Sequence, residues 1–110
     1  MRDGPTLVLS GDFDVRSTWR VRTAIYDLIS AHSGDVVVDL TEVDSVDVTA
    51  LKVLAVATRH VGRDGHHLTL RGCSSAVLRL LHMSHLIRVV EVERRASGDG
   101  PGTTVMVQVS

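Results

Sequence analysis

Residues 36–61 carry the clearest hydrophobic pattern of the chain. The apolar run from Val36 to Val38 predicts a strand that is buried on both faces. Further on, apolar residues recur at intervals of three and four, the spacing of one helical face; they are Ala50, Val53, Leu54, Ala57 and Val61. Asp47 directly precedes them and predicts an N-cap, because its carboxylate can accept from the free amides of the first turn. The stretch therefore predicts a strand, a polar loop and a capped helix.

Two elements are expected before this unit. Thr6 to Ser10 alternate weakly in polarity and end at a glycine, which predicts a strand and a turn. A second helical stripe predicts a helix from about Arg16 to Ala31, with Gly34 as its stop signal. Trp19 and Tyr26 are seven residues apart on a face displaced from that stripe. Their rings either form a partner surface or pack on the edge of the sheet.

The second half of the chain continues the alternation of strands and helices. A polar turn at Gly62–Gly65 precedes a predicted strand at His66–Arg71. Ser74 predicts the N-cap of a helix over residues 75–85, and Leu86–Val92 is typical of a final buried strand. Strands that alternate with helices imply parallel pairing with helical crossovers.

Length and composition indicate one globular domain over residues 1–110. The chain is 44% hydrophobic and 23% charged, so a packed core is expected rather than disorder. The formal net charge of −1 provides no basic field for a phosphate backbone, which disfavours direct nucleic-acid binding. The single cysteine, Cys73, cannot form an internal disulfide and fits a reducing cytoplasm. No apolar run is long enough to cross a bilayer, and the first residues lack a signal-peptide layout, so we expect a cytoplasmic protein without membrane insertion.

The sequence offers little for catalysis or for a cofactor. His82 with His85, and His66 with His67, are the only close histidine pairs, and neither has a third ligand near it in sequence. Neither a nucleophile elbow nor a phosphate-binding or dinucleotide-binding glycine motif is present. We therefore expect no enzyme activity, no catalytic residue, no cofactor and no metal site.

Two motifs resemble the STAS domains, the family of bacterial anti-sigma factor antagonists. Asp39-Leu40-Thr41 is similar to the family's strand end, and Asp47, Thr49 and Leu51 match its helix start. Gly11-Asp12-Phe13-Asp14 resembles the Gly-Glu-Leu-Asp that closes a STAS strand. The resemblance covers about residues 6–93, which it marks as the core of the domain. It implies an α/β fold with a mixed, mostly parallel sheet of about four or five strands and helices packed on it.

The two ends of the chain depart from the family plan. Few residues precede the first predicted strand, so the usual edge strand is missing. Arg94–Gly102 is a polar linker rich in glycine, and Thr103–Val109 is strongly β-prone. We expect this C-terminal strand to pair beside Thr6–Ser10 in place of the missing one, in the same chain or in a swapped dimer; a frayed tail is the alternative.

The resemblance also implies a partner-binding face, at Asp14, Asp47, Val48, Thr49 and Lys52. In the family a kinase partner phosphorylates a serine directly after the aspartate, and that position is Val48 here. Thr49 is therefore the candidate phosphoacceptor, and Ser45 is a weaker one. The alternative roles are structural: Thr49 bonding to local backbone, Ser45 shaping the turn from Asp44, and Asp14 capping the next helix. Asp47→Lys is expected to abolish partner binding and to leave melting close to wild type.

Two functions of different classes follow. The first is an anti-sigma factor antagonist that binds an anti-sigma factor of the serine/threonine kinase type and so frees a sigma factor for transcription. The second is a non-phosphorylatable STAS scaffold subunit of a stress-signalling or membrane lipid-transport complex, which Ala50 favours because the antagonists carry glycine there. A binding protein for a nucleotide or lipid has no motif behind it. Monomer and homodimer both stay open.

Overall fold

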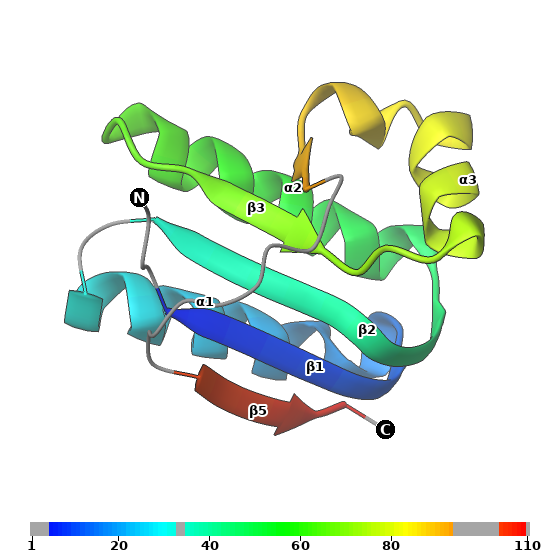
Figure 1. The fold of residues 1–110 in the computed structure, drawn as a ribbon, viewed down its shortest axis with the longest axis horizontal. Helices are drawn as coiled ribbons and strands as arrows, with labels where there is room; N and C mark the ends of the chain where they lie inside the picture. Colours follow the sequence, from blue (N-terminus) through cyan, green and yellow to red (C-terminus); the bar gives the residue numbers. More distant parts are fainter. Residues whose placement is uncertain (1–4, 33–34, 94–103, 110) are drawn as a thin grey trace.

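The computed structural model describes residues 5–32, 35–93 and 104–109. These residues form a five-stranded sheet in the order β4-β3-β2-β1-β5, and all four strand pairings are parallel (Figure 1). The strands are β1 Thr6–Phe13, β2 Val36–Val46, β3 Leu68–Arg71, β4 Glu91–Val92 and β5 Thr104–Gln108. The expected α/β fold with a mostly parallel sheet of about four or five strands is confirmed.

Three α-helices in the described ranges complete the fold; they are α1 Thr18–His32, α2 Val48–Arg63 and α3 Ser75–Met83. Two short 3-10 turns, η1 Val15–Ser17 and η2 Leu86–Arg88, precede α1 and follow α3. Figure 1 shows α1 and α2 side by side behind the sheet. Alternate residues of the strands point to these helices and are fully buried, among them Leu7, Leu9, Val38, Leu68 and Leu70. One continuous core therefore joins the sheet to α1 and α2.

The helix starts follow the capping residues expected from the sequence. Asp47 caps α2, and Ser74 caps α3 by accepting a hydrogen bond from the amide of Val77 at 3.2 Å. The two predicted N-caps are confirmed. The predicted stop signal at Gly34 lies outside the described residues.

The predicted strand at Leu86–Val92 is wrong for most of its length. His85 adopts a left-handed backbone with φ of 65°, and a 3-10 turn follows at Leu86–Arg88. Only Glu91 and Val92 pair with β3. The apolar residues of this segment pack against the core from a turn instead of from a strand.

The C-terminal strand takes the position expected for it. β5 pairs in parallel with β1, with Thr6 opposite Thr104 and Ser10 opposite Gln108. The amide of Val109 continues this ladder by donating to the carbonyl of Ser10 at 2.8 Å. The expected linker at Arg94–Gly102, and Thr103, lie outside the described residues.

Candidate functional site

Asp47 connects two strand-to-helix junctions at one edge of the sheet. Its Oδ1 accepts from the amide of Ala50 at 2.8 Å, which caps α2. Its Oδ2 accepts from the amide of Val15 at 3.2 Å, and its own amide donates to the carbonyl of Phe13 at 3.3 Å. Because the strands are parallel, their carboxyl ends and the helix N-termini meet at this edge. Asp47 therefore fixes the start of α2 relative to the end of β1.

This geometry corrects the expectation for Asp47→Lys. Both carboxylate oxygens of Asp47 bond to backbone amides, so a lysine there would leave two amides without their acceptor. The substitution would lower stability, and a loss of binding could not be assigned to the surface alone.

Asp14 lies at the same edge and caps the turn that follows β1. Its carboxylate accepts from the amide of Arg16 at 3.0 Å and pairs with the Arg16 guanidinium at 2.7 Å. These hydrogen bonds, followed by the charge of Arg16, lower the pKa of Asp14 from its ordinary value. Ser17 completes a capping box with Asp14. The capping role expected as the alternative for Asp14 is confirmed, and Asp14 also lies beside the Asp47 junction.

Three predicted partner-binding residues follow Asp47 on the first turns of α2. Thr49 and Lys52 are exposed, and Val48 is half-buried. Within the described ranges, the Thr49 hydroxyl makes no hydrogen bond, so the expected local bond to backbone is not formed. The start of α2 thus presents a rigid backbone with a hydroxyl and an ammonium group directed to solvent.

Ser45 lies in a strand and not in a loop. The predicted polar loop from Asp44 is wrong, because β2 continues to Val46 and Asp47 alone separates it from α2. The Ser45 hydroxyl donates to Oδ1 of Asp12 on β1 at 2.8 Å. Sequence reasoning missed Asp12 as a partner of Ser45; the parallel register of β1 and β2, which places the two residues opposite each other, is the signal that identifies it.

A second polar cluster lies at the end of β3. Gly72 has φ of 71°, and a Cβ there would overlap Thr41 Oγ1 and come within 3.1 Å of Asp39 Oδ1. The next residue, Cys73, is partly buried, and burial followed by the charge of Asp39 raises the pKa of its thiol to about 11. The thiol therefore stays protonated at neutral pH, which disfavours a nucleophilic role for Cys73.

In residues 5–32, 35–93 and 104–109, no group of three or more histidine, cysteine, aspartate or glutamate side chains could hold a metal ion. Within the same ranges, no helix is long and apolar enough to cross a membrane.

The fold and the site together define an α/β domain with a parallel sheet and an exposed, capped helix start at its strand-to-helix edge. A family model described as "Mlab, STAS domain" matches residues 2–91. The chain belongs to the STAS domain family, as its two sequence motifs indicated.

Solved structures give the same fold. A candidate anti-sigma factor antagonist from Thermotoga maritima is similar with a TM-score of 0.69 and 17% identity, over 80% of each chain. The anti-sigma factor antagonist SpoIIAA in its unphosphorylated form gives a TM-score of 0.64 and 11% identity, over 87% of this chain and 84% of that one. The SulP transporter STAS domain from Vibrio cholerae gives 0.62 and 18%, over 84% and 73%. A comparison with curated proteins finds no match. At these identities the similarity establishes the fold alone. The similar structures include both antagonists and transporter domains.

Proposed function

We propose that this protein is an anti-sigma factor antagonist that acts by docking, without catalysis, on an anti-sigma factor of the serine/threonine kinase type. Docking would free a sigma factor for transcription. The observation that carries the proposal is the start of α2, where Asp47 is held by two backbone amides while Thr49 and Lys52 are exposed. The fold that the chain shares with SpoIIAA supports it.

A rigid helix start is suited to recognition because little conformational entropy is lost there on binding. Asp47 fixes the backbone before a partner arrives, so the exposed side chains of Thr49 and Lys52 are already in place. Lys52 supplies a cation one turn from the cap, for a carboxylate of the partner.

The test is a binding titration with a purified anti-sigma kinase from the same organism. Lys52→Glu is expected to weaken binding about tenfold, because a carboxylate at position 52 would face the partner's carboxylate and repel it. Arg79→Glu on α3 is the matched control, since Arg79 is also exposed and lies on another helix. If wild-type protein binds no such kinase, or if both variants weaken binding alike, the proposed function is wrong.

Thr49 is the proposed phosphoacceptor. Its hydroxyl is exposed and without a hydrogen-bond partner in the described part of the chain, whereas the Ser45 hydroxyl already bonds to Asp12. A phosphate on Ser45 would also face the Asp12 carboxylate, which adds like-charge repulsion. Incubation with the kinase and ATP should add about 80 Da to Thr49 and none to a Thr49→Ala variant.

A second function, a STAS scaffold subunit without a phosphorylation switch, is favoured by one specific observation. Val48 occupies the position after the helix cap where the STAS antagonists carry their phosphoacceptor serine. The family description and the transporter STAS domains among the similar structures support this candidate as well. Absence of any mass gain on Thr49, together with stable co-purification of a transporter or stress-complex subunit, would favour the scaffold over the antagonist.

A further inference from the structure

Exposed large apolar side chains are concentrated on η1, α1 and α2. In the described part of the chain, five large hydrophobic side chains are more than half exposed. Three of them belong to η1, α1 and α2: Val15 at 59%, Trp19 at 74% and Val56 at 60% exposure. The other two, Met83 and Met106, lie on different elements. An apolar cluster of this kind marks an interaction surface more often than scattered single residues do.

Two contacts fix how α1 and α2 lie against each other. In the second half of each helix, the ring of Tyr26 packs edge-on against His60, with 5.0 Å between ring centroids. At their N-terminal ends, the amide of Val15 donates to Asp47. Both helices return between parallel strands and so run in the same direction. Their residues therefore face each other in a nearly constant register.

Counting along the two helices from these contacts, we infer that Trp19 is at about the level of Lys52 and Arg22 at about the level of Val56. Tyr26 thus packs against α2 and not on the edge of the sheet, and Trp19 is open to solvent; of the two alternatives, packing of both rings on the sheet edge is wrong. We call this surface the α1–α2 seam. It consists of Trp19, Arg22, Tyr26, Lys52, Val56 and Arg59.

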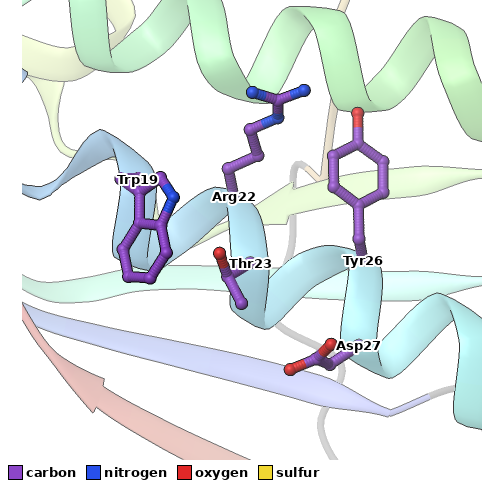
Figure 2. Close-up of a pocket in the computed structure, with 5 residues that line it drawn as sticks. All are labelled: Trp19, Arg22, Thr23, Tyr26 and Asp27. Atoms are coloured by element: carbon purple, nitrogen blue, oxygen red, sulfur yellow. The ribbon is translucent and has the colours of Figure 1, made fainter.

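The α1 side of the seam carries a shallow pocket of about 240 Å³. Figure 2 shows Arg22 and Tyr26 directed toward the neighbouring helix, and Trp19 at the end of the row. Thr23 and Asp27 line the other side. The pocket can accept an apolar side chain beside the Trp19 ring, with charged groups at its rim.

The charges along the seam are mainly positive. The Arg22 guanidinium lies 5.8 Å from the centroid of the Tyr26 ring. Lys52 and Arg59 are exposed, and neither forms an ion pair with any residue that the structure describes. Asp27 is the one anion lining the pocket. The whole chain has a net charge of −1, so this positive face is a local feature.

We propose that the α1–α2 seam binds an acidic amphipathic helix of the partner protein. Its apolar residues would cover Trp19 and Val56, and its carboxylates would lie near Arg22, Lys52 and Arg59. A second copy of this chain fits poorly, because a two-fold contact would bring the same cations together. The inference deepens the proposed function, since it gives the chemistry of the partner at a surface continuous with the start of α2.

Trp19 is the only tryptophan of the chain, so its fluorescence reports directly on the seam. The experiment selects binders to the intact protein from a random displayed peptide library and titrates the enriched peptides while tryptophan emission is followed. Enriched peptides are expected to be acidic, with apolar residues three and four apart, and to shift Trp19 emission to shorter wavelength. Arg22→Glu combined with Arg59→Glu should weaken them about tenfold. Arg79→Glu combined with Arg88→Glu, which reverses two exposed cations elsewhere, should leave their affinity unchanged.

Three results would overturn the inference. One is the enrichment of basic or non-periodic peptides, or of none; another is binding that leaves Trp19 emission unchanged. A third is an equal emission shift with phosphatidylglycerol vesicles, or with protein concentration alone, which would assign the seam to a membrane or to a second copy. The proposed function fails separately. If peptides bind at Trp19 but no anti-sigma kinase binds, the seam proposal stands and the antagonist function is wrong. If the kinase binds without a change in Trp19 emission, the antagonist function stands and the seam proposal is wrong.

Discussion

At the scale of single residues, Asp47 holds the candidate site together through its two carboxylate hydrogen bonds. It caps α2 and also accepts from Val15 at the end of β1. Asp47→Ala should lower the free energy of unfolding by about 1–2 kcal/mol, because one cap and one bond between junctions are lost. Urea unfolding followed by circular dichroism measures this change.

Asp44 is the control for that experiment, since it is an exposed aspartate three residues earlier on β2. Asp44→Ala should change stability by less than about 0.5 kcal/mol. Equal effects of the two variants would mean that the Asp47 bonds contribute nothing to stability.

Gly72 and Gly62 form a second residue-scale pair with opposite predictions. Gly72 has positive φ, and a Cβ there would overlap Thr41 and lie 3.0 Å from the Thr41 amide nitrogen. Gly72→Ala should therefore destabilise the fold by about 1–3 kcal/mol. Gly62 lies within α2 with open space around it, so Gly62→Ala should stabilise by up to about 1 kcal/mol. Thermal melting of both variants checks the signs, and destabilisation by both would reject this explanation.

At the scale of elements, β5 provides the sharpest contrast between its two faces. Val107 packs against the core from this edge strand, whereas Met106 is 69% exposed. Val107→Asp should lower the melting temperature by several degrees, since a carboxylate would replace an apolar contact. Met106→Asp should leave it nearly unchanged. Similar melting of the two variants would indicate that β5 does not pair with β1 in solution.

The helices and the order of elements could be predicted from the sequence because local signals determine them. Asp47 and Ser74 are capping residues directly before apolar stripes, and both caps are formed. The position of β5 could be predicted because Thr103–Val109 is β-prone and STAS domains usually have an edge strand beside the strand that ends in Gly-Glu-Leu-Asp.

Other features depend on contacts that no local pattern reveals. Leu86–Val92 has the composition of a strand, but the left-handed His85 turns the chain and only Glu91 and Val92 reach β3. The polar residues after Leu40 suggested a loop, yet pairing with β1 extends β2 to Val46. The second hydrogen bond of Asp47, from the amide of Val15, joins two residues that are 32 apart in the sequence. It forms only because the fold brings the two strand-to-helix junctions together, so no local pattern predicts it.

At the scale of the whole molecule, the parallel sheet gathers helix starts and carboxylates at one edge. Asp12, Asp14 and Asp47 meet there, and each is engaged in hydrogen bonds within the domain. On the first turns of α2 the exposed residues are Thr49 and Lys52, and the α1–α2 seam extends from Lys52 along both helices. The molecule thus combines a fixed acidic edge with an accessible hydroxyl and a cationic apolar surface.

The most direct test of docking at the start of α2 is the affinity of the protein for its anti-sigma kinase, measured by calorimetry for wild type, Thr49→Glu and Thr49→Ser. Thr49→Glu should weaken binding at least about tenfold with an unchanged melting temperature, because a carboxylate would enter the interface without touching the Asp47 cap. Thr49→Ser should bind like wild type. Wild-type affinity in Thr49→Glu would contradict docking at this helix start.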